Sequence, residues 1–374
     1  MRLTTTLVAA ALGLAAAPAL AVEPAMLSRD IGVEPEKKVA ETRVFEDIVV
    51  APIPIANPTI GTGLAVVVMP FYKLGADSPL SNTALAAAYT SSGSWAVGAA
   101  QSTRLPRDRL RLDGFLGYGE LHYRFFGTGS AAGTAGASVP IEQKALALVP
   151  ELLYQVGGRT FLGVRYRGVR VETSLDTETA SPEFAALGGL SLTVVSSGLG
   201  PVVVFDTRDN DMSPSSGVLA ELRGNYADPN LGSDFKYSTY SASANYYHHL
   251  GPGVLALRAA ACQASGNTPL FDLCLYGSGN DLRGYEVGRY RDHAMFATQA
   301  EYRFPIYGRF GGVAFGGTGK IAPSFGEMSG EPQLPSYGAG LRWLASAKAH
   351  VNLSIDVAKG RDDTSVYVYV KEAF

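Results

Sequence analysis

The feature that most constrains this chain is an alternation of apolar and polar residues with a period of two, repeated along most of its length. Residues 110–118, 218–226 and 296–306 each carry apolar side chains at every second position, with charged or amide side chains between them. Successive side chains of a strand point to opposite faces, so each stretch predicts a strand with one apolar and one polar face. The longest apolar run after the first 21 residues, Leu64 to Tyr72, is about nine residues long. A membrane-spanning helix needs roughly 18 or more.

Two features favour a membrane barrel over a soluble β-sandwich, which alternates in the same way. Many segments are about ten residues long or longer, the length that a tilted strand needs to cross a bilayer. Aromatic residues also gather near their ends, as at Tyr118 and Tyr123 or at Tyr246 and Tyr247. Gly is abundant at 43 residues and only 17% of residues are charged, which is unlike a helical enzyme. The sequence therefore predicts an all-β protein, a transmembrane antiparallel up-and-down β-barrel.

Fifteen segments can be marked by pattern, the first over 60–72 and the last over 364–374. A single-chain bacterial barrel with both ends in the periplasm has an even number of strands, so we expect sixteen. We place the missing strand in the ambiguous stretch from Gly119 to Pro140. Polar-face charges such as Arg223, Arg342 and Asp356 are expected to line a water-filled lumen.

The N-terminus has the pattern of a signal peptide. A positive Met1-Arg2 is followed by an apolar stretch over 7–17 and by Pro18-Ala19-Leu20-Ala21, a cleavage site of the Ala-x-Ala type. We therefore expect export to the cell outer membrane, with outer-membrane lipids as surroundings. The expected domains are a cleaved signal peptide over 1–21, a short periplasmic segment over 22–47 and an outer-membrane β-barrel over 48–374.

Four motifs stand in a fixed order along the barrel region. They are Pro52-Ile53-Pro54 near its start, Phe205-Asp206-Thr207-Arg208-Asp209 with Pro214 and Gly217, then Leu282-Arg283-Gly284-Tyr285, and Glu301-Tyr302-Arg303-Phe304-Pro305. The chain ends on Phe374. In this order and spacing the chain resembles the BamA/TamA superfamily, also called the bacterial surface antigen family. The resemblance implies a first strand opening over Pro52-Ile53-Pro54, Asn57-Pro58-Thr59 and Gly61-Thr62-Gly63, a periplasmic hairpin at 206–217, a sorting signal at Phe374, and biogenesis by the outer-membrane assembly machinery.

The Leu282-Arg283-Gly284-Tyr285 motif lies in a segment, 267–293, that is too long for an idle connection. The resemblance implies that this long extracellular loop folds into the lumen, where its Arg meets acidic residues on the barrel wall. Glu301, on the polar face of the following strand, is the expected ion-pair partner. Gly317 stands where many family members have Asp, so we expect Glu301 to carry most of the pairing. Without the motif, a solvated loop Arg is the simpler interpretation.

Cys262 and Cys274 are twelve residues apart and flank the start of the same loop. An even pair of cysteines in an exported protein predicts a disulfide. Such a bond would restrict the loop at its entry.

No enzyme motif is found in the sequence. It has no nucleophile elbow, no P-loop and no Cys-x-x-Cys, and His248 and His249 point to opposite faces of one strand. We therefore expect no catalytic residue, no metal and no cofactor, and the net charge of −3 gives no support to nucleic-acid binding.

Two classes of function remain. The resemblance implies insertion or translocation of polypeptide or lipid at the outer membrane, using the seam between the first strand, 61–72, and the last, 364–374. The roughly 27 residues between Val22 and Ile48 are too few for a polypeptide-transport-associated (POTRA) domain, which favours the barrel-only branch of the family. The alternative is a loop-plugged channel or structural barrel with no protein client. The client, polypeptide or lipid, is not specified by the sequence.

Overall fold

The computed structural model describes residues 47–57, 59–75, 77–78, 81–176, 191–210, 213–277, 281–346, 351–362, 364–370 and 372–374. The predicted signal peptide and the predicted periplasmic segment lie outside these residues, except for Asp47. No helix in the described ranges is long and apolar enough to cross a membrane.

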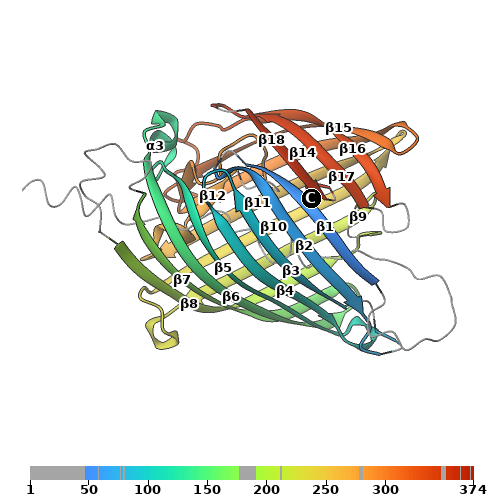
Figure 1. The fold of residues 1–374 in the computed structure, drawn as a ribbon, viewed down its shortest axis with the longest axis horizontal. Helices are drawn as coiled ribbons and strands as arrows, with labels where there is room; N and C mark the ends of the chain where they lie inside the picture. Colours follow the sequence, from blue (N-terminus) through green and yellow to red (C-terminus); the bar gives the residue numbers. More distant parts are fainter. Residues whose placement is uncertain are drawn as a thin grey trace, which may run out of the picture.

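Sixteen strands form one antiparallel sheet that curls into a nearly closed barrel (Figure 1). Each strand pairs with the next along the chain, so the all-β, up-and-down, sixteen-stranded expectation is confirmed. The strands are β1 (Asp47–Asn57), β2 (Gly61–Tyr72), β3 (Ser81–Thr90), β4 (Trp95–Arg104), β5 (Leu110–Phe125), β6 (Val139–Gly157), β7 (Thr160–Leu175), β8 (Ser191–Asp206), β9 (Gly217–Ala227), β10 (Tyr237–Leu250), β11 (Gly253–Gly266), β14 (Ala294–Tyr307), β15 (Phe310–Ala322), β16 (Ser336–Ser346), β17 (Val351–Lys359) and β18 (Thr364–Val370).

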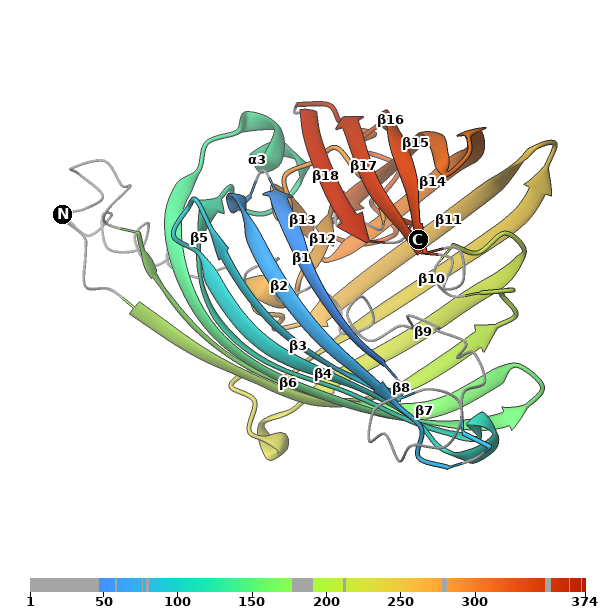
Figure 2. The ribbon, with the colours of Figure 1, turned by 45° about the vertical axis from the view of Figure 1, so that its right-hand side comes forward.

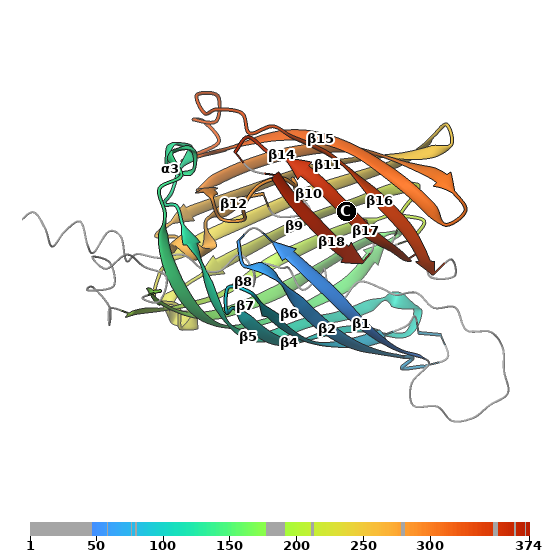
Figure 3. The same ribbon diagram turned by 45° about the horizontal axis from the view of Figure 1, so that its top comes forward.

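The remaining elements lie in the connections. They are η1 (Pro106–Asp108), α3 (Ser130–Ala135), η2 (Pro229–Leu231), η3 (Leu270–Asp272) and a small two-stranded sheet of β12 (Cys274–Tyr276) and β13 (Tyr290–Asp292). Both β12 and β13, together with η3, belong to the long loop between β11 and β14. β12 contacts the wall strands β11, β14 and β15, and Figure 3 shows it near β11 and β14.

The two faces of the wall follow the alternation in the sequence. On β6, Leu146 and Leu148 are exposed on the outer face, whereas Ala145 and Ala147 are buried on the inner face. On β5, Leu116 and Tyr118 point outward in the same way. An apolar outer face and a polar or small inner face are what a barrel surrounded by lipid requires.

The missing strand is β1, and its predicted place between Gly119 and Pro140 was wrong. That stretch contains the end of β5, the short helix α3 and the start of β6. The strand at Asp47–Asn57 is easily missed because Pro52 and Pro54 interrupt its pattern, and proline is tolerated mainly in edge strands. β1 is such an edge, since it begins the strand order. The last strand also ends earlier than predicted, at Val370.

Candidate functional site

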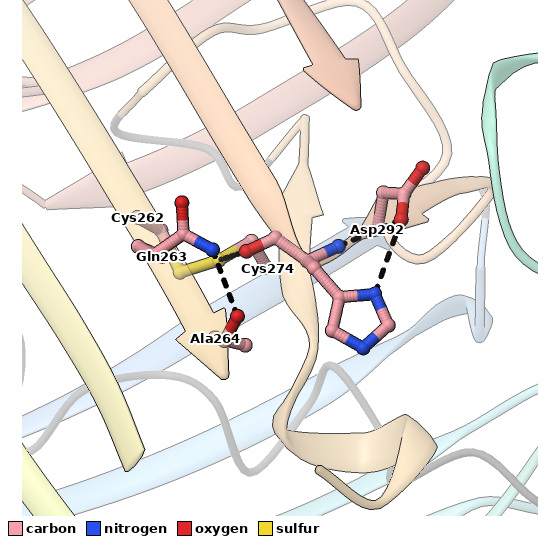
Figure 4. The surroundings of a disulfide bond; sticks show 6 residues. Cys262, Gln263, Ala264, Cys274 and Asp292 are labelled. Carbon is pink, nitrogen blue, oxygen red and sulfur yellow. Dashed lines mark hydrogen bonds and ion pairs between the residues drawn. A yellow bond between two sulfur atoms is a disulfide. The ribbon is translucent and has the colours of Figure 1, made fainter. Parts of the chain in front are cut away.

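The loop 267–293, which we call the lumen loop, is fixed at its start by a disulfide. Cys262 near the end of β11 and Cys274 in β12 are bonded, with their Cα atoms 5.6 Å apart (Figure 4). A backbone hydrogen bond adds to this attachment. The amide of Ala264 in β11 donates to the carbonyl oxygen of His293, at the other end of the loop. The two ends of the lumen loop are therefore held close together.

Arg283, in the middle of the lumen loop, has no exposed surface and is surrounded by polar partners from the wall. Its guanidinium forms ion pairs with Glu301 of β14 and Asp356 of β17, and both carboxylates are also fully buried. It donates to the Gln299 side chain at 3.0 and 3.2 Å, and lies 3.4 Å from the centre of the Phe315 ring. A buried cation with paired carboxylates and an aromatic face beneath it is well compensated.

The ion pairs of Arg283 belong to a closed ring of six alternating charges, which we call the lumen ring. Its members, in order, are Arg283, Glu301, Arg303, Glu372, Arg342 and Asp356. The Arg303–Glu301 and Arg342–Glu372 contacts are both 2.7 Å, and Arg303–Glu372 is longer at 3.6 Å. Three guanidinium groups balance three carboxylates, so the ring joins the loop, β14, β16, β17 and the C-terminal residues without a net charge.

The structure brings Arg283 and Glu301 together, and it gives Arg283 a further carboxylate partner beyond the one expected. Asp356 supplies a second carboxylate from β17. The motif around Gly317 gave no indication of this residue. Gly317 itself is crowded: a Cβ atom there would lie 2.2 Å from the carbonyl oxygen of Thr298 and 2.5 Å from Leu282. An Asp at this position does not fit the observed backbone, so the clamp uses another strand instead.

The other residues of the motif fix the loop backbone. Leu282 and Tyr285 are fully buried, and the Tyr285 hydroxyl donates to the Pro335 carbonyl at 2.6 Å. Gly284 has φ +105°, and a Cβ atom there would meet the backbone of Gly360 at 2.8 Å, so only glycine suits this position. Its amide donates to the Tyr367 hydroxyl of β18 at 2.8 Å. The motif therefore attaches the loop to the last strand.

A second attachment, which the sequence did not indicate, lies on another part of the wall, at β7, β8 and β10. Asp272 of η3 accepts two hydrogen bonds of 2.6 Å from Arg167 of β7 and further hydrogen bonds from Tyr237 of β10 and Ser196 of β8. An acidic residue in a loop carries no signal in the sequence that would distinguish it from a solvated one. The lumen loop thus contacts the wall at β7, β8 and β10 as well as at β14 and β17.

The predicted periplasmic hairpin forms a compact turn between β8 and β9. Arg208 donates to both oxygens of Asp206 at 2.8 and 2.9 Å, and Gly217 has φ +105° close to the Thr207 carbonyl. The Pro214 carbonyl accepts a hydrogen bond of 3.3 Å from Arg303, so the hairpin reaches the lumen ring.

Asp209 organises the hairpin electrostatically. Burial alone raises the pKa of its carboxyl group, but hydrogen bonds from the Ser215 hydroxyl and from the amides of Ser215 and Ser216 stabilise the carboxylate more strongly. The net effect is that the pKa of Asp209 is lowered below its ordinary value of 3.8.

Phe374 lies beyond the end of β18, beside the inner face of the barrel. Its carbonyl oxygen accepts a hydrogen bond of 2.8 Å from Arg303, and its ring lies 6.5 Å from that of Tyr247. Both of these partners are buried. The terminal residue is therefore connected to the lumen ring.

The two ends of the sheet, β1 and β18, are neighbours, as Figure 2 shows. The predicted seam between 61–72 and the last strand is corrected accordingly, because β1 lies between them. Pro52 pairs with Val66 and Pro54 with Leu64 in the β1–β2 ladder. Neither proline can donate, so these are the non-hydrogen-bonded pairs, and their nitrogens point away from β2 toward β18. The edge of β1 therefore lacks two donors on its seam side.

These features define a class of protein: a transmembrane β-barrel whose interior is crossed by a clamped extracellular loop. A profile of the Omp85 superfamily domain matches residues 106–368, and the chain belongs to this superfamily. The resemblance to BamA/TamA barrels expected from the motifs is thereby confirmed. No curated protein matches the sequence.

Solved structures share the fold at low identity. BamA from Haemophilus ducreyi lacking POTRA domains 1–3 is 13% identical, with a TM-score of 0.58, over 88% of this chain and 75% of that one. CdiB from Escherichia coli is 14% identical, with a TM-score of 0.59, over 86% and 61%. CdiB from Acinetobacter baumannii is 11% identical, with a TM-score of 0.54, over 86% and 59%. The chain thus spans about three fifths of each CdiB chain.

Proposed function

We propose that this outer-membrane barrel inserts or translocates polypeptide or lipid, and that it does so at the seam between β1 and β18. The observation that carries the proposal is the edge of β1, where Pro52 and Pro54 present no donor toward β18. A sheet edge that cannot complete its own ladder is a site where another strand can compete for pairing.

The lumen loop supports the same proposal because it contacts the seam on both sides. The Gly284 amide donates to Tyr367 of β18, and the Val287 amide donates at 3.0 Å to Thr59, which follows β1. A change in the loop is thereby transmitted to both edge strands. Loop and seam form one connected unit.

Restoring the missing donors tests this proposal. We expect the double variant Pro52→Val, Pro54→Val to strengthen the seam. In the assay, an unfolded outer-membrane barrel protein is diluted from urea into liposomes that contain the chain, and its folding should be slower with the double variant than with the wild type. Pro150→Val is the matched control, since Pro150 interrupts the β6–β7 ladder in the middle of the wall. Equal folding rates in liposomes with the wild type, in liposomes with the seam variant and in empty liposomes would end the proposal.

The alternative is a loop-plugged channel or structural barrel with no protein client. The buried lumen loop favours it, because Arg283 and Tyr285 are fully buried. In that case the folding rate of the added barrel protein is unchanged by the chain, whereas ion conductance rises when the loop is released.

We also propose that the chain is exported by a signal peptide over 1–21 and that Phe374 serves as part of a sorting signal for the outer-membrane assembly machinery. The apolar stretch over 7–17 and the terminal aromatic residue support this. N-terminal sequencing of the mature protein tests cleavage before Val22, and deletion of Phe374 tests recovery in the outer-membrane fraction.

A further inference from the structure

A group of His and Glu side chains lies outside the lumen, on the outer face of β5 and β6. In the β5–β6 ladder, His122 is directly opposite Glu142, and Glu120 is directly opposite Lys144. All four residues belong to the same face as Tyr118, which is outward and exposed. Across the described part of the chain, Glu120, His122 and Glu142 form the one group of three His, Cys, Asp or Glu residues with suitably close ligand atoms.

The aromatic residues beside the group indicate where it lies relative to the membrane. Tyr118 and Trp95 of β4 contact each other edge to face, with ring centres 5.6 Å apart. Aromatic residues of this kind mark the boundary between the apolar band and the polar surroundings. Glu120 and His122 follow Tyr118 toward the end of the barrel at which the lumen loop lies, so the group is at the polar side of that boundary.

The geometry is close to that of a metal site. The potential ligand atoms all lie within 4.8 Å of one another, and Nε2 of His122 is 3.4 Å from a carboxylate oxygen of Glu120. Zinc bonds to nitrogen and oxygen are about 2.0–2.2 Å long, so ligand atoms of one ion lie roughly 3.3 Å apart. The two Glu side chains are only partly buried, at 24% and 22% exposed, and can make this small approach.

The histidine is oriented by groups that are not themselves in the ligand set. Nδ1 of His122 lies 3.2 Å from a carboxylate oxygen of Asp176, which is 4% exposed. This contact favours a proton on Nδ1 and leaves the lone pair of Nε2 directed at the two Glu residues, which is the carboxylate–histidine arrangement of zinc sites. The backbone amide of His122 is held by the Ser94 hydroxyl at 2.9 Å.

Lys144 supplies the positive charge at this position. Its ammonium group lies 2.7 Å from Glu142 and 3.8 Å from Glu120, and its side chain is 42% exposed. A flexible, exposed lysine can swing outward when a divalent ion takes its place. We propose that Glu120, His122 and Glu142 bind a Zn²⁺-class divalent cation on the outer surface, with Asp176 as a positioning residue and Lys144 as the group that the ion displaces.

The test is titration calorimetry with Zn²⁺ on the full chain, purified in detergent without a polyhistidine tag. We expect one ion per chain for the wild type, loss of this binding in His122→Ala, and tighter binding in Lys144→Met. Asp176→Asn should weaken binding by about 10–100-fold, the usual effect of losing such a partner. His293→Ala is the matched control, because His293 also has an Asp beside Nδ1 at 3.4 Å but is not part of the ligand group.

Heat-modifiable gel migration establishes that each variant is folded. Folded His122→Ala that no longer binds Zn²⁺, beside His293→Ala that binds like the wild type, supports the proposal. Absence of binding to the wild type overturns it, whatever Lys144→Met does. Equal affinity of wild type and His122→Ala also overturns it.

Discussion

Two attachments of the lumen loop, at Asp272 and at Arg283, differ in how much of the barrel each one uses. Asp272 meets a single cation, Arg167, whose side chain remains 23% exposed. Arg283 belongs to a ring of six charges whose members are almost entirely buried. Removal of Asp272 leaves a cation that water can still reach, whereas removal of Arg283 leaves two carboxylates without exposure. The loop can therefore be released at either of these two attachments, and release at Arg283 disturbs far more of the structure.

The largest effect is expected for Arg283→Ala. Removal of one partner of a buried ion pair costs about 3–5 kcal/mol, because the remaining charge stays buried. We expect a lower unfolding temperature, higher single-channel conductance and faster proteolysis within 281–293. Lys236→Ala is the control, because its ion pair with Asp228 is at the surface and the Lys side chain is 79% exposed.

Glu301→Gln opens the same ring from the wall and should produce changes of the same kind. If both Arg283→Ala and Glu301→Gln behave like the wild type in conductance and proteolysis, the loop is not held by the lumen ring.

The disulfide is the next largest contribution and belongs to the Asp272 half of the loop. Closure of a twelve-residue separation stabilises by about 3 kcal/mol on chain-entropy grounds. Cys262→Ser with Cys274→Ser should therefore expose 263–277 to protease while residues near Arg283 stay protected. Thiol labelling of unreduced, denatured wild type should find no free cysteine, and quantitative labelling would contradict the bond.

Gly317→Ala should loosen the attachment of the lumen loop at Arg283 without removing a charge. Its Cβ atom would lie 2.2 Å from the Thr298 carbonyl oxygen, and overpacking of this kind costs about 1–3 kcal/mol. Gly316→Ala is the neighbouring control, because its Cβ atom would have no contact closer than 3.6 Å. Unfolding midpoints in denaturant compare the two, and equal midpoints would show that the wall adapts at Gly317.

Asp272→Asn should have a smaller effect than these, about 1.5 kcal/mol, as for a hydrogen bond to a charged group. Conductance should rise less than in Arg283→Ala. Because the two residues contact different walls, the double variant should show the sum of the single effects within about 0.5 kcal/mol. Strong non-additivity would mean that the loop moves as one rigid piece.

The two attachments also differ in how far the sequence predicts them. Strand alternation predicted the barrel, and the rule that bacterial barrels have an even number of strands raised the fifteen marked segments to sixteen. The motif at Leu282 to Tyr285 drew attention to Arg283. Asp356 and Arg342 were expected only as lumen charges, since pairing across β14, β16 and β17 depends on strand register. Asp272 had no local signal at all. Its partners, Arg167 and Tyr237, come from strands that are distant in sequence, and only the curled sheet brings them together with Asp272.

The smallest effect concerns the predicted periplasmic hairpin, which meets the ring through Pro214 and Arg303. The pKa of Asp209 is lowered in the folded chain, so its carboxylate stabilises the hairpin above the ordinary value of 3.8. This contribution is lost as the pH falls below 3.8 and through the lower folded pKa. Pepsin cleavage within 207–216 should therefore increase as the pH falls below 3.8, while the buried segment around Arg283 stays protected.

Asp209→Asn is the matched variant for this experiment. An amide has no negative charge at any pH, so its hairpin should be loosened already at pH 5 and should show no further step on acidification. Two other titratable groups lie nearby: the Asp206–Arg208 pair, and His249, which is 3.1 Å from the Ser215 hydroxyl. Both are present in the wild type and in Asp209→Asn, so their contribution to the acid response is the same in the two proteins. A wild-type hairpin whose cleavage follows that of Asp209→Asn at every pH would assign the acid response to those groups. Simultaneous exposure of 281–293 would instead show that hairpin and ring open together, because Pro214 and Arg303 join them too tightly to separate.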